Sequence, residues 1–464
     1  MQVVATAGHV DHGKSTLVRA LTGMEPDRWA EERRRGLTID LGYAWTTLPS
    51  GAVVAFVDVP GHSRFLGNML AGLGPAPAVL FVVAADEGWR QQSTEHLAAV
   101  DALGLTEGVL AVTRSDRADA APALAEARER IGQSSLGRVD AVAVSGTTGA
   151  GLDDLRAALD RMSTSAEPAD VDAPVRLWVD RAFTMQGSGT VVTGTLSAGT
   201  IGVDDTLELD GRPVRVRGLQ SLGAAYDEVR AVARVAVNLR GVDRHRVGRG
   251  QALLTPKVWR PTSTVDVRLP ADDLPRQLRL HAGTAAVTTR VRRLGGGLAR
   301  LSLARPLPLL AGDRVVLRDV AGDGAITGGL IVDTNPGPAR RPDPAPAPSK
   351  VLSPGVDVLA ARLARAPFDA PERAELDALG LGRPELTAAV SAGRLLRLPS
   401  VVVLLPDAPD RAVELLAALP QPFTPSDARQ AWGTTRRVAI PLLEHLDGRG
   451  RTRRLDGVLR EVVR

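Results

Sequence analysis

Cysteine is absent from this sequence of 464 residues, which excludes disulfide bridges, cysteine-ligated zinc sites and a thiol nucleophile. Apolar runs approaching the roughly 18 residues of a membrane span are also missing, and the N-terminus has no charged segment followed by an apolar leader. We therefore expect a cytoplasmic protein with no membrane association. Hydrophobic residues still make up 44% of the chain, which is enough for packed cores, and the length predicts roughly three or four domains.

Lysine is almost as scarce, because Lys14, Lys257 and Lys350 stand among 57 basic residues and the rest are arginines. A lysine inside a motif whose chemistry requires one therefore carries extra weight. The net charge of +4 does not by itself point to a nucleic-acid partner.

The pattern of elements divides the chain. In residues 1–168, strand-like apolar runs alternate with helical patterns such as 93–103 and 152–160, which predicts a parallel α/β sheet. The expected strands are Gln2–Ala7, Val53–Asp58, Ala78–Ala84, Gly108–Thr113 and Ala141–Ser145. Between 174 and 336, short β-rich runs broken by glycine replace the helical periodicity, which is typical of β-barrels or sandwiches. The length there suits two domains, 174–257 and 258–336.

A proline-rich stretch at 337–349 has the composition of an extended linker. The tail after it contains a weak repeat, because Pro-Phe occurs at 367–368 and again at 422–423. Each copy continues with a short helix, a longer helix and a β-like end, which predicts winged helices at 350–408 and 409–464. A bare helical hairpin is the alternative for each copy.

The strongest motif is the run from Gly8 to Ser15, which matches G-x-x-x-x-G-K-[ST] between an expected strand and an expected helix. Such a loop surrounds phosphate oxygens with backbone N–H groups; Lys14 adds a positive charge, and the Ser15 hydroxyl can ligate Mg²⁺. A glycine-rich turn with a stray lysine is the alternative, and the scarcity of lysine disfavours it. The expected nucleotide-binding residues are Gly8, His9, Val10, Asp11, His12, Gly13, Lys14, Ser15 and Thr16.

Further motifs follow in the order expected for a GTP site. Thr38 and Asp58 are expected to hold Mg²⁺, Asp58 through water, and Asp116 can accept two hydrogen bonds from guanine. A lone aspartate after a strand is usually a cap, but several motifs at the carboxyl ends of parallel strands favour a ligand site. The remaining expected nucleotide-binding residues are Gly61, Thr113, Arg114, Ser145 and Gly146.

These motifs together resemble those of the translational GTPases: GHVDHGKS from Gly8, RGLTID from Arg35 and DVPGH from Asp58 match that family's phosphate loop and two switches. The resemblance implies binding of GTP and GDP with Mg²⁺, and a catalytic role for His62, which would orient the attacking water on the ribosome. A helix cap is the alternative role for His62. The family's Asn-Lys-x-Asp motif reads Thr113-Arg114-Ser115-Asp116 here, so the preference for guanine rests mainly on Asp116.

Other segments resemble the selenocysteine-specific elongation factors within that family: 25–28, 33–42, 180–184, 187–195, 234–241 running on to 249–251, and 423–463. The resemblance implies an α/β P-loop GTPase domain, two β-barrel domains and an α+β winged-helix tail. It also implies a monomer that delivers selenocysteyl-tRNA to the ribosome at UGA codons and recognises a selenocysteine insertion hairpin in the mRNA. Members often carry four winged helices, whereas this tail has room for two.

Asp180, Arg181 and Arg234 are the expected selenocysteine pocket, with Asp180 orienting Arg181. A selenol is far more acidic than a serine hydroxyl, so an arginine pocket selects the selenolate by charge. Solvated arginines on a barrel surface are the alternative interpretation.

Residues 421–464 contain nine arginines against five acidic residues, whereas 366–406 contains four against five. Only the second copy is therefore basic, which predicts RNA binding there; a solvated charged face is the alternative. The expected RNA-binding residues are Thr434, Arg436, Arg437, Arg451 and Arg453. Two other functions remain open: a general elongation factor for other aminoacyl-tRNAs, and a nucleotide-binding winged-helix regulator of nucleic acid.

Overall fold

The computed structural model describes residues 1–26, 38–185, 189–270, 274–319, 325–337, 353–382, 385–386, 389–390, 392–398, 402–455 and 459–463. Most of the expected first switch and nearly all of the proline-rich linker lie outside these residues. The chain forms two compact units, 1–342 and 343–464, so the division falls inside the expected linker. The finer domain bounds stay predictions.

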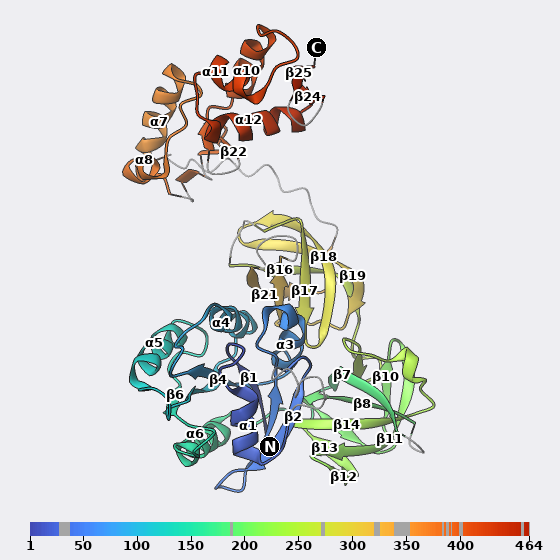
Figure 1. Cartoon of the computed structure of the whole chain (residues 1–464). Helices are drawn as coiled ribbons and strands as arrows, with labels where there is room; N and C mark the ends of the chain where they lie inside the picture. The colour runs from blue at the N-terminus through green and yellow to red at the C-terminus, as the bar shows by residue number, and fades with distance from the viewer. Residues whose placement is uncertain are drawn as a thin grey trace. The chain divides into compact units, whose positions relative to one another are not determined.

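The first unit begins with a six-stranded sheet of order β2-β3-β1-β4-β5-β6 (Figure 1, blue to teal). Both faces of this sheet are buried, which explains why its strands consist of nearly continuous apolar residues. The parallel strands are β1 (Gln2–Ala7), β3 (Val53–Asp58), β4 (Ala78–Ala84), β5 (Glu107–Thr113) and β6 (Asp140–Ala143). The covering helices are α1 (Lys14–Thr22), α3 (Leu66–Leu73), α4 (Gln91–Leu103), α5 (Ala121–Gly132) and α6 (Leu152–Ser165).

The expected α/β sheet is confirmed, with two differences. β6 ends at Ala143, two residues before the expected end. The strand β2 (Gly42–Thr47), which pairs antiparallel with β3 at the edge of the sheet, was not expected from the sequence. Because β2 is only partly buried and contains glycine and threonine, it lacks the continuous apolar run that marks the other strands.

The next domain is a ring of six antiparallel strands, because β10 pairs with β15 on one side and with β11 on the other (Figure 1, green). The ring strands are β7 (Arg176–Met185), β8 (Gly189–Leu196), β10 (Thr206–Leu209), β11 (Arg212–Ser221), β14 (Ala233–Arg240) and β15 (Ala252–Leu254). The short strand β12 (Ala224–Tyr226) pairs with β11, and β9 (Thr200–Gly202) and β13 (Glu228–Arg230) form a separate pair.

The third domain is a closed barrel of order β16-β19-β18-β17-β20-β21 (Figure 1, yellow). Its strands are β16 (Thr262–Arg268), β17 (Gln277–Ala282), β18 (Ala285–Gly295), β19 (Leu298–Leu307), β20 (Arg314–Arg318) and β21 (Ile326–Asp333). Arg176 joins the two barrels: its guanidinium pairs with Asp313 at 2.6 Å and lies 4.7 Å from the centre of the Trp259 ring. The expectation of two β-barrels is confirmed.

The second unit contains two winged helices that share one hydrophobic core. The first has α7 (Pro354–Arg365), α8 (Arg373–Ala378), β22 (Leu396–Leu398) and β23 (Val402–Leu404), and the second has α10 (Ala408–Ala417), α11 (Pro425–Ala431), α12 (Arg436–Gly448), β24 (Thr452–Arg454) and β25 (Arg460–Val462). The paired strands rule out bare helical hairpins. Phe368 and Phe423, the repeated aromatic residues, are both buried in this core.

Candidate functional site

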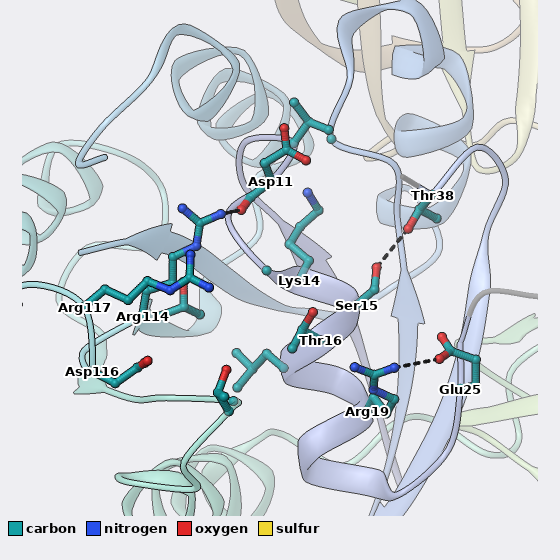
Figure 2. Close-up of a pocket in the computed structure, with 17 residues that line it drawn as sticks. Asp11, Lys14, Ser15, Thr16, Arg19, Glu25, Thr38, Arg114, Asp116 and Arg117 are labelled. Carbon is teal, nitrogen blue, oxygen red and sulfur yellow. Dashed lines mark hydrogen bonds and ion pairs between the residues drawn. The ribbon is translucent and has the colours of Figure 1, made fainter. Parts of the chain in front are cut away.

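A cavity of about 610 Å³ opens where β1 and β5 end, beside α1 (Figure 2). It is lined by Val10, Asp11, Gly13, Lys14, Ser15, Thr16, Leu17, Arg19, Glu25, Thr38, Gly61, Thr113, Arg114, Asp116, Arg117, Gly146 and Thr147. The carboxyl ends of parallel strands meet at this edge, so residues more than a hundred positions apart converge on one cavity. Its size and lining fit a nucleoside triphosphate.

The phosphate loop is packed closely around Lys14. Its Nζ donates to the backbone oxygens of Gly8 at 3.1 Å and His9 at 2.8 Å. A Cβ added at Gly61 would lie 2.5 Å from that Nζ and 2.5 Å from the backbone N of Val10, which cannot move aside, so only glycine fits there. The N–H of Gly61 can therefore approach the same phosphate oxygens as Lys14.

Three oxygens suited to Mg²⁺ lie together at the start of α1. Ser15 Oγ donates to Asp58 Oδ2 at 2.6 Å and lies 2.8 Å from Thr38 Oγ1. Mg²⁺ prefers oxygen ligands and usually keeps phosphate and water oxygens as well, so two hydroxyls and one carboxylate fit it. No cluster of three or more His, Cys, Asp or Glu side chains suited to a metal occurs within the described residues.

The other end of the cavity carries the expected base-binding motif. Thr113 Oγ1 donates to the backbone oxygen of His12 at 2.7 Å, which ties this motif to the phosphate loop. The Ser145 hydroxyl bonds the Asp116 carboxylate and holds its pKa below the usual value, so Asp116 stays ionised and able to accept hydrogen bonds from guanine. The guanidinium of Arg114, which also lines the cavity, is held by Asp86 at 3.0 Å, by Glu87 at 2.8 Å and by the backbone oxygen of Asp11.

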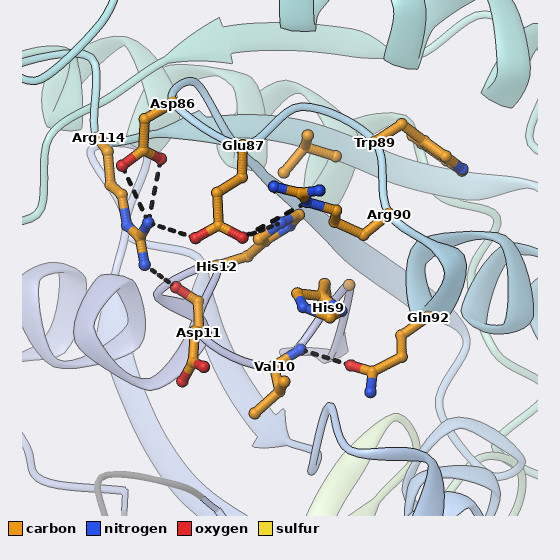
Figure 3. Close-up of polar contacts among 12 residues, drawn as sticks. His9, Val10, Asp11, His12, Asp86, Glu87, Trp89, Arg90, Gln92 and Arg114 are labelled. Atoms are coloured by element: carbon orange, nitrogen blue, oxygen red, sulfur yellow. Dashed lines mark hydrogen bonds and ion pairs between the residues drawn. The ribbon is translucent and has the colours of Figure 1, made fainter.

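Some expected nucleotide-binding residues contribute backbone or support without lining the cavity. The side chains of His9 and His12 are turned beneath the loop (Figure 3), and His12 is fully buried. Asp58 and Ser145 are buried behind the lining residues. His62 is exposed outside the cavity, and its Nδ1 accepts a hydrogen bond from the Arg64 N–H at 3.1 Å.

Two residues that were not expected from the sequence, Gln92 and His96, hold backbone N–H groups of the phosphate loop. His96 Nδ1 accepts from the Gly8 N–H at 3.0 Å. Gln92 Oε1 accepts from the Val10 N–H at 3.0 Å (Figure 3). Both residues come from α4. Burial lowers the pKa of His96 to about 3 and that of His12 to about 4, so both rings are neutral at neutral pH. No local sequence pattern marks Gln92 and His96 as supports of the phosphate loop; only their proximity to it in the fold does.

Because His96 and His12 are held neutral in the fold, we expect the stability of the first unit to fall in acid. Unfolding raises their pKa values toward about 6.5, so the unfolded state binds more protons than the folded state. The free energy of unfolding should therefore fall as the pH drops from about 6.5 toward 4. Urea unfolding at several pH values measures this slope. His96→Asn keeps a hydrogen-bond acceptor without a titrating ring and should flatten the slope; an unchanged slope would contradict the assignment.

A second polar cluster lies in the ring domain. Arg234 Nη1 bonds Asp180 Oδ2 at 2.5 Å and Thr195 Oγ1 at 3.1 Å, and Thr193 donates to Asp180 Oδ1 at 2.6 Å. Burial alone would raise the pKa of Asp180, but Arg234, Thr193 and Arg181 together outweigh it and hold that pKa below its usual value. The side chain of Arg234 is only 11% exposed, so it is not a solvated surface residue.

Arg181 occupies a different place in this cluster. Its Nη2 donates to the backbone oxygen of Leu41, and its Cζ lies 4.7 Å from the centre of the Tyr43 ring. We expected Asp180 to orient Arg181, but its carboxylate bonds Arg234 instead. A cavity of about 180 Å³ is lined by Arg234 with Tyr43 and does not include Arg181.

In the second unit, the expected RNA-binding residues separate into two groups. Thr434 Oγ1 donates to the backbone oxygen of Phe368 at 2.6 Å, and Arg437 Nη2 donates to that of Ala370 at 2.6 Å. These two residues join the winged helices to each other. Arg436, Arg451 and Arg453 are exposed, although Arg451 pairs with Asp410 and Arg453 pairs with Glu461.

No helix in the described part of the chain is both long enough and apolar enough to cross a membrane.

Three family profiles match the chain. "Elongation factor Tu GTP binding domain" matches residues 1–165, "Selenocysteine-specific elongation factor, beta-barrel domain" matches 270–338, and "Elongation factor SelB, winged helix" matches 414–458. Each profile falls on the domain whose architecture it describes.

Relatives and solved structures agree with these profiles. The selenocysteine-specific elongation factor of Escherichia coli is 39% identical over 72% of this chain and 56% of its own length. Elongation factor Tu 2 of Streptomyces avermitilis is 33% identical over 57% of this chain and 75% of its own length. The crystal structure of a bacterial selenocysteine-specific elongation factor, EF-Sec, shares the fold with a TM-score of 0.69 at 23% identity, covering 100% of both chains. The chain spans about half the length of the curated selenocysteine-specific relatives it matches.

Proposed function

Because the chain belongs to the translational GTPases, the family of elongation factor Tu and the selenocysteine-specific elongation factors, we propose that it hydrolyses GTP while delivering selenocysteyl-tRNA to the ribosome at UGA codons. The relatives named for this activity, the barrel profile and the winged-helix profile support the proposal. It places the protein in the cytoplasm as a monomer.

In the proposed reaction, water attacks the γ-phosphate of GTP. Lys14 and the N–H of Gly61 stabilise the outer phosphates, and His62 orients the water once the ribosome places it. Ser15, Thr38 and Asp58 would hold Mg²⁺, Asp58 through water, and the ion would neutralise phosphate charge. Asp116 and Ser145 would bind guanine. The chain's own contribution is positioning and electrostatic stabilisation.

The observation that carries the selenocysteine assignment is a buried arginine beside a cavity. Arg234 lines the cavity of about 180 Å³, where the aminoacyl side chain would fit. Among the described residues of this cluster, Arg181, Arg234 and Arg249 face Asp40 and Asp180, which leaves an excess of positive charge. A selenolate would balance that charge, whereas a neutral serine hydroxyl would not.

Arg234→Asn should weaken binding of selenocysteyl-tRNA by about 10- to 100-fold, since a charge-assisted hydrogen bond contributes roughly 1.5–3 kcal/mol. Seryl-tRNA binding should stay nearly unchanged, because a neutral hydroxyl gains little from the charge. Equilibrium titrations against one tRNA body carrying either amino acid measure both affinities.

Arg240→Asn is the matched control, because Arg240 is exposed on the same strand. Equal losses for both aminoacyl groups in Arg234→Asn would mean that Arg234 contacts the tRNA itself. Equal wild-type affinity for both would favour a general elongation factor instead.

The proposal also includes recognition of an mRNA hairpin by the second winged helix. Arg436, Arg451 and Arg453 are exposed around the start of α12 and the strand pair, where they suit an RNA backbone. Thr434 and Arg437 would act indirectly, by fixing α12 against the first winged helix.

A further inference from the structure

Arg249 lies where three distant segments of the first unit meet. Its Nε donates to the backbone oxygen of Asp180 at 3.0 Å, and its Nη1 donates to Asn68 Oδ1 at 2.8 Å. Its Nη2 lies 2.5 Å from Asp40 Oδ1. Each guanidinium nitrogen therefore holds a different segment: β7, α3 or the stretch before β2. A lysine ammonium in the same place could not reproduce this fork.

Asp40 connects this junction to the nucleotide site. It follows Thr38 by two residues, and Thr38 Oγ1 lies 2.8 Å from Ser15 Oγ in the proposed Mg²⁺ site. The residue between them is also held, since the backbone oxygen of Ile39 accepts from Asn68 Nδ2 at 2.8 Å. Residues 38–41, the switch segment, are thus fixed at one end by the phosphate site and at the other by Arg249.

The opposite side of the junction is the arginine pocket. Arg249 bonds the backbone of Asp180, whose side chain holds Arg234. Arg181 bonds the backbone of Leu41 and lies 3.7 Å from Asp40. A displacement of the switch segment would therefore remove contacts from Arg181 and from Arg249, which in turn holds the backbone of Asp180.

We infer that Arg249 is a positioning residue that couples the nucleotide at Thr38 to the affinity of the arginine pocket for the aminoacyl group. The inference rests on the proposed function. When Thr38 is held in the GTP form, Asp40 is held against Arg249 and Arg181, and the pocket is assembled. When Thr38 is released in the GDP form, the pocket loses that support. By thermodynamic linkage, bound aminoacyl-tRNA must raise the affinity for GTP relative to GDP by the same factor by which GTP raises the affinity for aminoacyl-tRNA.

The test measures the ratio of selenocysteyl-tRNA affinities with a non-hydrolysable GTP analogue and with GDP. Couplings of this kind are typically about 5- to 150-fold, and Arg249→Ala should reduce the ratio toward one. Arg249→Lys should fail to restore it. Arg246→Ala, at the exposed end of the short helix that precedes Arg249, should keep the wild-type ratio. A wild-type ratio in Arg249→Ala would overturn the inference while leaving the proposed function intact.

A second measurement needs no tRNA. Hydrogen exchange at the amides of residues 179–182 should be slower with the GTP analogue than with GDP in the wild type. Arg249→Ala and Asp40→Asn should each remove that difference, which guards against one variant simply misfolding. Absence of tRNA binding in both nucleotide states would reject the proposed function, whereas equal exchange in both states of the wild type would reject the coupling.

Discussion

Lys14→Ala is expected to lower GTP affinity by about 100- to 10,000-fold, because hydrogen bonds to a charged group contribute roughly 1.5–3 kcal/mol each and Lys14 can serve two phosphate oxygens. Its Nζ already lies within hydrogen-bond distance of two loop oxygens, at the place where the outer phosphates would bind. Equilibrium binding of a fluorescent GTP analogue measures the loss.

The chain offers a matched control in Lys257→Ala, since Lys257 is exposed between the two barrels and should bind GTP normally. Lys14→Arg keeps the positive charge but should still lower the affinity for GTP, because the space beside Gly61 is too small for a guanidinium. Wild-type affinity in Lys14→Ala, with the fold intact by circular dichroism, would show that this loop does not bind the phosphates.

His62→Ala should slow ribosome-stimulated GTP hydrolysis by about 100- to 10,000-fold, the usual range for a group that assists proton transfer or orients the nucleophile. Binding of GTP and of aminoacyl-tRNA should not change, because His62 is exposed and lies outside the cavity lining. Single-turnover hydrolysis on ribosomes separates the chemical step from binding.

His245→Ala is the control for this prediction, since His245 is an exposed histidine in the short helix η2 (Arg244–Arg246) of the ring domain. It should hydrolyse GTP at the wild-type rate. Should His62→Ala also do so, the water must be oriented by another residue.

The domain architecture was predictable because its signals are local. A phosphate loop between a strand and a helix, and strand-ending motifs such as Asp58 and Asp116, occur in one sheet whose topology brings them together. The edge strand β2 was missed because its burial is only partial. The closed barrels follow from residue patterns only in outline, since their strand order depends on pairing between distant segments.

The contacts within the arginine pocket of Asp180, Arg181 and Arg234 could not be predicted from the sequence. Adjacency in sequence suggested that Asp180 orients Arg181, but Asp180 lies at a bulge in β7, where the pairing register skips from Val179 to Arg181. Bulges change the direction of a side chain, and here the carboxylate faces Arg234 on another strand. Arg249 and Asp40 lie 209 residues apart, and nothing in either local sequence indicates their contact.

The common core of the two winged helices has a consequence for the modularity of the tail. Trp432 from the second copy stacks on Phe368 from the first, with ring centres 5.7 Å apart, and its indole donates to the backbone oxygen of Ala412. Deleting either copy would expose apolar surface that its neighbour now covers. The smallest portable unit of this tail is therefore the pair, and a graft or truncation that cuts between the copies removes half of one folded body.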